Sequence, residues 1–97
     1  MSKNDILSLI RNDAELIRQR FAVRRLALFG SAARDALREG SDIDLLVEFE
    51  GPATFEGYMD LKFHLEALLG RSVDLVTVKG LREELRPQVE KEAVRVA

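Results

Sequence analysis

Three aspartates lie in segments of the sequence that otherwise have the pattern of β-strands. Asp42 and Asp44 flank Ile43 at the start of "SDIDLLVEFE", and Asp74 interrupts the apolar run "VDLVTV". Strand sequences usually avoid aspartate, and charged side chains are rarely buried without a partner. Because successive side chains of a strand point to opposite faces, Asp42 and Asp44 share one face, about 7 Å apart. Acids held together in this way repel each other, so the pattern predicts a bound cation.

The available ligands indicate which cation. The chain has no cysteine and one histidine, so carboxylate oxygens are the main donors, and these suit Mg²⁺ rather than zinc. If the strand with Asp74 lies beside the strand with Asp44 in the right register, all three acids meet. Each acid also has a simpler interpretation: Asp42 in solvent at a strand start, Asp44 paired with an arginine, and Asp74 on an exposed edge. We favour the metal site because the acids occur together with a phosphate-binding turn.

That turn is formed by Gly30 and Ser31, where a predicted strand passes into a predicted helix. Such a turn exposes backbone N–H groups at the positive end of the helix dipole, and the serine hydroxyl can donate to a phosphate oxygen. Arg34, one turn into the helix, adds positive charge. A triphosphate beside a divalent cation is the arrangement of in-line phosphoryl or nucleotidyl transfer. No G-x-x-x-x-G-K-[ST] loop is present, so the chain is not a P-loop NTPase.

The elements that position these residues follow from hydrophobic periodicity and from glycine and proline. The sequence predicts a helix over about residues 5–20, a strand ending at Gly30, a helix capped by Ser31 and ended by Gly40, a strand over 41–50, a helix over 55–69, a strand over 72–78, and helical segments on both sides of Pro87. The order αβαβαβα predicts an α/β (α+β) fold with a small mixed sheet of three or four strands packed against helices.

Composition sets the limits of this interpretation. With 97 residues, of which 46% are hydrophobic, the chain fits one domain over 1–97 with one modest core. The net charge of -2 gives no overall attraction for a nucleic-acid backbone, so direct nucleic-acid binding is not expected. No segment has the pattern of a signal peptide or membrane span, and the lack of cysteine fits a reducing compartment. We therefore expect a cytoplasmic protein.

The three motifs "FGSAAR", "SDIDLLVEF" and "VDLVTV" resemble the polymerase-beta-like nucleotidyltransferase superfamily. Its signature is Gly-Ser, a gap of roughly ten residues, then Asp-x-Asp on a strand and a third acid on a later strand. The resemblance covers nearly the whole chain and is closest to the minimal nucleotidyltransferases (MNT), the antitoxins of HEPN/MNT toxin–antitoxin pairs. It implies the nucleotidyltransferase fold.

The resemblance also implies roles for individual residues. Gly30 and Ser31 would contact the nucleotide phosphates, with Arg34 beside them, and Asp42 and Asp44 would bind Mg²⁺. Asp74 would complete the metal site and help activate the acceptor. The implied reaction transfers AMP from ATP to a hydroxyl, a tyrosine of a partner HEPN RNase toxin, in a hetero-oligomer. One departure is Asp35, because relatives often have glycine after the arginine.

Two alternatives remain open at this stage. One is a binding-only antitoxin that blocks its toxin sterically without catalysis; the acid triad argues against it, because a pure binder has no need of mutually repelling carboxylates. The other is a transferase that acts on RNA or a small molecule. Six further side chains invite a functional role, but for each we favour packing or a solvated surface: Arg24, Arg25, Tyr58, His64, Arg82 and Arg86.

Overall fold

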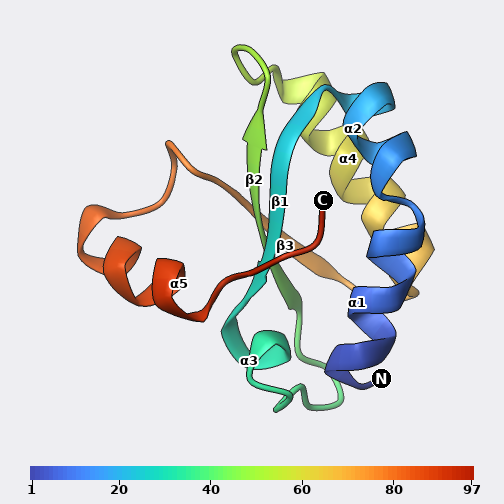
Figure 1. Cartoon of the computed structure of the whole chain (residues 1–97), viewed down its shortest axis with the longest axis vertical. Helices are drawn as coiled ribbons and strands as arrows, with labels where there is room; N and C mark the ends of the chain where they lie inside the picture. Colours follow the sequence, from blue (N-terminus) through green and yellow to red (C-terminus); the bar gives the residue numbers. More distant parts are fainter.

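A four-stranded mixed sheet forms the centre of the computed structural model, which describes residues 1–97 (Figure 1). Its strand order is β3-β2-β1-β4. The strand β1 pairs antiparallel with both β2 and β4, and β2 pairs parallel with β3. The strands are β1 (Val23–Phe29), β2 (Ile43–Phe49), β3 (Val73–Thr77) and β4 (Val94–Arg95). The predicted mixed sheet with packed helices is confirmed.

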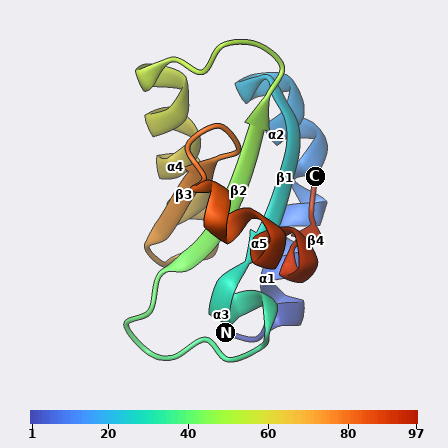
Figure 2. The same cartoon turned by 90° about the vertical axis from the view of Figure 1, so that its left-hand side faces the viewer.

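Three helices cover one face of this sheet, and the C-terminal segment lies on the other (Figures 1 and 2). The first group is α1 (Lys3–Asn12), α2 (Ala14–Phe21) and α4 (Phe55–Leu69). The C-terminal segment contains the 3₁₀ turn η1 (Glu83–Leu85) and the helix α5 (Arg86–Glu92). None of the helices has the length and apolar character needed to cross a membrane.

The core lies between the sheet and the first group of helices. Ile43, Leu45 and Val47 of β2 are completely buried there, as their alternation with the acids predicts. Isoleucines of α1 and α2 and leucines of α4 pack in the same cluster. Asp44 therefore points to the opposite face of the sheet, away from the core helices.

The helix predicted over residues 5–20 is wrong in one respect, because it is two helices that meet at Asp13. The backbone N–H of Asp13 bonds to the carbonyl of Ile10, 3.0 Å away, which tightens the last turn of α1. The Asp13 carboxylate lies 2.6 Å from Nε2 of His64 on α4. The apolar spacing continues across this break, so periodicity alone does not reveal it.

The helix predicted between Ser31 and Gly40 is also wrong in its start and length. The helix α3 spans only Gly30–Ala33, its N-cap is Phe29, and Ser31 lies inside it. Asp35 adopts a left-handed backbone with φ 56° just after the helix, and this conformation ends a helix as glycine does. Four residues carry a weaker dipole than the predicted eight or so, which reduces the helix contribution to anion binding.

The C-terminal segment differs from the prediction at its end. Pro87 lies in the first turn of α5, as predicted, because proline lacks the N–H that this position leaves unpaired. After α5 the chain does not continue as a helix but forms β4, which pairs with Ala27 and Leu28 of β1. The final two residues, Val96 and Ala97, are buried in the core.

Candidate active site

Asp44 and Asp74 occupy neighbouring positions on adjacent strands. The parallel register of β2 and β3 pairs these two residues directly, so the predicted approach of the two strands is confirmed. On the other side of β2, Asp44 pairs with Phe29, the last residue of β1. Both carboxylates therefore lie on the sheet face that the core helices leave open, at the end where the chain turns through Gly30.

The pKa of Asp44 shows how strained this pair is electrostatically. Burial, the charge of Asp74, a hydrogen bond with the Asp74 side chain and the charge of Asp42 together raise it from 3.8 to about 6, and the charge of Arg34 acts in the opposite direction. Two carboxyl groups this close favour a shared proton over two charges. A divalent cation that replaced the proton would offset both the free-energy cost of burying the charges and the repulsion between them.

Gly30 is the residue that allows Asp44 its position. A Cβ on Gly30 would lie 2.1 Å from Oδ2 and 3.0 Å from Cγ of Asp44. The backbone of Gly30 also has φ +69°, where side chains are disfavoured. From the sequence, Gly30 is part of a turn predicted to bind phosphate. The structure gives a reason within the chain itself, because the Asp44 carboxylate fills the space that a side chain would take.

Arg34 lies at the C-terminal end of α3 and is tied to α5. Its Nη1 donates to Oε1 and Oε2 of Glu92, at 3.0 and 3.1 Å. The guanidinium is about half exposed, and its charge acts on Asp44. Arg34 is therefore close enough to the carboxylate pair for its charge to act on Asp44, while its guanidinium forms an ion pair with Glu92.

The predicted metal site is a pair of carboxylates with a third nearby. Asp42 precedes β2, is exposed and affects Asp44 through its charge. No group of three or more acidic, histidine or cysteine side chains is arranged to hold a metal ion. Mg²⁺, however, is commonly bound by one or two carboxylates together with substrate phosphates and water. The oxygen donors therefore fit a Mg²⁺ ion that arrives with a nucleotide triphosphate.

Asp35, the residue that departs from the family pattern, makes its side-chain hydrogen bond to α1 and not to Asp44 or Asp74. Its Oδ1 accepts a hydrogen bond from the backbone N–H of Lys3, 2.8 Å away, at the start of α1. Its left-handed backbone explains why glycine is suitable at this position, and aspartate is among the side chains that tolerate it. The Asp35 carboxylate is therefore engaged at the start of α1, in a hydrogen bond with Lys3.

We expect Asp35→Asn to leave the free energy of unfolding within about 0.5 kcal/mol of wild type, because asparagine tolerates the backbone and keeps an acceptor for Lys3. Asp35→Ala should cost about 1–2 kcal/mol, since it loses both. Urea denaturation measures these changes, and ATP titration of both folded variants serves as the control. A marked gain of ATP affinity in Asp35→Asn would show that Asp35 does repel phosphate.

The side chains for which we favoured structural roles mostly have them. The Tyr58 hydroxyl donates to the carbonyl of Leu75. Arg24 and Arg25 form exposed ion pairs with Glu48. The charges of "LREELR" predict an exposed helix face for Arg82 and Arg86. Arg82 is exposed, but Arg86 is half-buried, so this prediction is wrong for Arg86.

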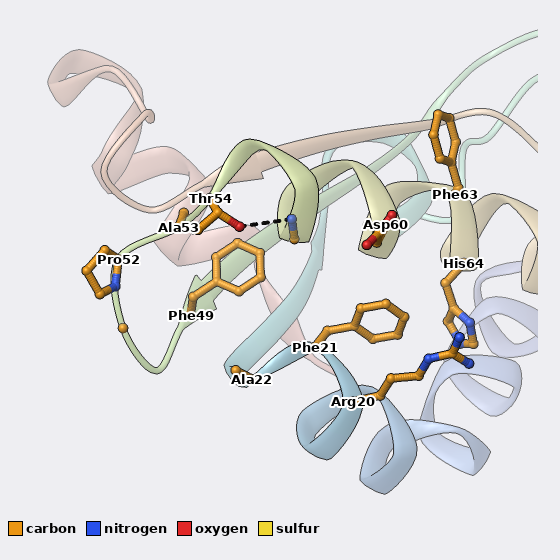
Figure 3. Close-up of a pocket in the computed structure, with 12 residues that line it drawn as sticks. Arg20, Phe21, Ala22, Phe49, Pro52, Ala53, Thr54, Asp60, Phe63 and His64 are labelled. Carbon is orange, nitrogen blue, oxygen red and sulfur yellow. Dashed lines mark hydrogen bonds between the residues drawn. The ribbon is translucent and has the colours of Figure 1, made fainter.

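The largest hollow of the molecule lies at the opposite end of β2 and contains none of the predicted site residues. It measures about 770 Å³ and lies between the ends of α2 and β2 and the start of α4. Figure 3 shows the rings of Phe21 and Phe49 facing this space, while Phe63 points away from them. His64 lies at the edge of this hollow, and the centre of its ring is 5.1 Å from the centre of the Phe21 ring. Size alone therefore does not identify the chemical site.

A carboxylate pair beside a Gly-Ser turn, on the open face of this mixed sheet, defines the nucleotidyltransferase class. The sequence matches the nucleotidyltransferase domain family over residues 10–96, and the chain belongs to this family. The resemblance to minimal nucleotidyltransferases and the predicted enzyme class are confirmed.

Individual relatives are similar over most of their length. A protein adenylyltransferase, MntA of Thermococcus cleftensis, is 36% identical over 99% of this chain and 97% of its own. A solved structure described as a minimal nucleotidyltransferase is 41% identical, with a TM-score of 0.83, over 97% of this chain and 95% of that one.

A more distant structure, a tri-AMPylated HEPN toxin with MNT antitoxin from Shewanella oneidensis, has a TM-score of 0.67 at 22% identity, over 94% of this chain and 71% of that one. At this identity it shows the shared fold alone.

Proposed function

We propose that this chain is a Mg²⁺-dependent protein adenylyltransferase that transfers AMP from ATP to a tyrosine hydroxyl of a partner HEPN toxin and so acts as its antitoxin. The observation that carries the proposal is the directly paired Asp44 and Asp74, with the pKa of Asp44 raised to about 6, in a chain of the nucleotidyltransferase family. The lack of cysteine favours the cytoplasm as the place of action.

In this proposal the Gly30-Ser31 turn holds the phosphates of ATP. Backbone N–H groups of the turn and the Ser31 hydroxyl donate to phosphate oxygens, and Arg34 supplies positive charge from the same side. Asp42, Asp44 and Asp74 provide oxygens for Mg²⁺. When bound, the ion would supply positive charge that stabilises the negative charge developing on the phosphate oxygens. Gly30 keeps the Asp44 carboxylate against the turn, so the phosphates and the acids stay side by side.

The transfer forms one bond and breaks one. Asp74 accepts the proton of the acceptor hydroxyl, whose oxygen attacks the α-phosphorus of ATP. The bond between that phosphorus and the bridging oxygen breaks, and pyrophosphate leaves. The acceptor becomes an AMP ester.

A protein acceptor is supported by the relatives. MntA, which this chain covers almost completely, is named a protein adenylyltransferase, and solved structures of the same fold are toxin–antitoxin complexes. The site lies outside the largest hollow, on the sheet face that the core helices leave uncovered, and Asp74 is exposed there, so an acceptor side chain carried by another protein has access to it.

Mass spectrometry of the partner tests the proposal. The partner HEPN toxin should gain the mass of one or more AMP units after incubation with the protein, ATP and Mg²⁺, and lose its RNase activity. The modified residue should be a tyrosine. Asp44→Asn is the matched control and should leave the toxin unmodified. A toxin that is inhibited but unmodified by wild-type protein would indicate a binding-only antitoxin instead.

A further inference from the structure

Glu92 is an acidic residue that the fold places beside the Gly30-Ser31 turn. It is the last residue of α5, and the chain after it forms β4. The strand β4 pairs antiparallel with β1, with Val94 opposite Leu28. Because paired positions in antiparallel strands run in opposite directions, continuing this register by two residues brings Glu92 level with Gly30. In Figure 2, α5 and β4 lie beside the part of β1 that leads into α3.

The Glu92 carboxylate contacts a single nitrogen of Arg34. Both of its oxygens accept hydrogen bonds from Nη1, at 3.0 and 3.1 Å. The Glu92 side chain is 23% exposed and that of Arg34 is 53% exposed, so the more buried glutamate holds the more exposed arginine. Nε and Nη2 of Arg34 form no hydrogen bond within the chain.

This contact leaves one edge of the guanidinium available to a phosphate. A guanidinium is a rigid plane with five N–H donors, and it binds phosphate oxygens well through two parallel hydrogen bonds. The edge formed by Nε and Nη2 can donate such a pair while Nη1 stays on Glu92. A phosphate can therefore bind Arg34 without breaking the ion pair.

Stability alone gives little reason for an acid at this position. Exposed ion pairs contribute little to the free energy of unfolding. A carboxylate at the C-terminal end of a helix is also disfavoured by the helix dipole. A long arginine side chain, however, loses rotamer entropy when it is fixed against a ligand, and a partner that already fixes it removes this cost from binding. Glu92 is placed to be such a partner.

We infer that Glu92 is a positioning residue, which holds the Arg34 guanidinium with its Nε–Nη2 edge directed at the phosphates of the nucleotide. The inference rests on the proposed function, because it takes Arg34 as a phosphate ligand. Glu92 touches no substrate and acts through Arg34. The pairing of β4 with β1 then contributes to the site, because it fixes Glu92 beside the turn.

Calorimetric titration with AMP-PNP and with inorganic tripolyphosphate, each in the presence of Mg²⁺, tests this role. Glu92→Met keeps a long side chain without an acceptor and should weaken both ligands by about 5- to 10-fold, within the range of coupling in one ion-pair network. Glu92→Gln keeps one acceptor oxygen and should restore part of the affinity. A glutamate that only competed with phosphate for Arg34 would give the opposite sign, with tighter binding in Glu92→Met.

A double-mutant cycle shows whether Glu92 acts through Arg34. Arg34→Met alone should weaken both ligands by about 10- to 100-fold, the usual effect of losing a hydrogen bond from a charged donor. Adding Glu92→Met to Arg34→Met should change either affinity by less than about two-fold, because no guanidinium is left to position. An effect of Glu92→Met that is as large in the Arg34→Met protein as in wild type would overturn the assignment.

Glu50→Met is the matched control. It removes the acid from another exposed ion pair, with Arg24 at 3.4 Å, at the opposite end of β2 from the carboxylate pair. It should leave both affinities unchanged. Thermal melting shows that each variant is folded, and Glu92→Met should melt close to Glu50→Met because each loses one surface ion pair. If Glu92→Met is unfolded, Glu92→Gln decides the result.

The outcomes separate this inference from the proposed function. If wild-type protein binds both ligands and the folded Glu92 variants bind them equally well or more tightly, the positioning role is wrong and the proposed function stands. If Arg34→Met binds both ligands as wild type does, Arg34 is not a phosphate ligand and the inference fails with it. If wild-type protein binds neither ligand with Mg²⁺, the proposed function itself is wrong.

Discussion

Gly30→Ala is expected to lower kcat/KM for AMP transfer by at least about 100-fold, the usual effect of misplacing a reacting group by about 1 Å. The new Cβ would lie 2.1 Å from Oδ2 of Asp44, a distance that real contacts do not allow. Either the turn or the carboxylate must therefore move, and the Asp44 carboxylate can no longer lie beside both Asp74 and the proposed phosphate site. Labelled ATP and the partner toxin provide the assay.

Gly40→Ala is the matched control for this substitution. Gly40 also has a positive φ, 82°, but a Cβ there meets no atom within 4 Å. Both variants pay the cost of a left-handed alanine, about 1–2 kcal/mol, and only Gly30→Ala adds a collision. Gly40→Ala should therefore lose stability but keep its activity. Equal activities in the two folded variants would contradict the role of Gly30 in positioning Asp44.

The acids could be predicted because their arrangement depends on local geometry. Because the backbone of a strand is pleated, neighbouring side chains point to opposite faces of the sheet. Ile43 therefore faces the core and Asp44 the other side. The direct pairing of Asp44 with Asp74 could not be predicted outright, because it requires one particular register of β2 and β3. That register depends on how α4, which connects the two strands in the sequence, packs against the sheet. The structure meets that condition.

The errors have a common cause, which is contact between distant parts of the chain. α3 ends early because Asp35 turns its backbone and bonds to Lys3, 32 residues away. The two residues of β4 form a strand because the edge of β1 is free to pair with them, and so short a run is not enough to predict a strand from the sequence. Arg86 lies in "LREELR", whose charges suggest an exposed helix, and only the sheet face beneath α5 buries its Nε.

Asp44→Asn is expected to reduce kcat/KM by about 1,000-fold or more, in the range found when a central electrostatic group of an active site is lost. Asparagine has nearly the same shape, so the fold should be retained while one negative oxygen ligand for Mg²⁺ disappears. Asp60→Asn makes the same chemical change on the exposed surface of α4 and is the control. An Asp44→Asn protein with activity near that of Asp60→Asn would exclude Asp44 from the metal site.

The same variant should be more stable than wild type in EDTA at neutral pH, because it removes the burial of a charged group and the repulsion by Asp74 and Asp42, which together raise the pKa of Asp44 to about 6. The carboxyl is partly exposed, so solvent screening reduces the gain to about 1 kcal/mol. Urea denaturation at pH 7 measures it. A variant less stable than wild type under these conditions would contradict the proposed repulsion.

The raised pKa of Asp44 also determines whether the folded protein gains or loses stability as the pH changes. Because the folded protein takes up a proton at Asp44 near pH 6, and the unfolded chain does so only near 3.8, this group makes the protein more stable as the pH falls from about 7 to 4. The Asp44→Asn protein lacks this contribution, so its advantage in EDTA should shrink over that range. Mg²⁺ competes with the same proton and should raise the melting temperature of wild type more at pH 8 than at pH 5. If Mg²⁺ stabilises wild type and Asp44→Asn equally at pH 8, the ion binds elsewhere.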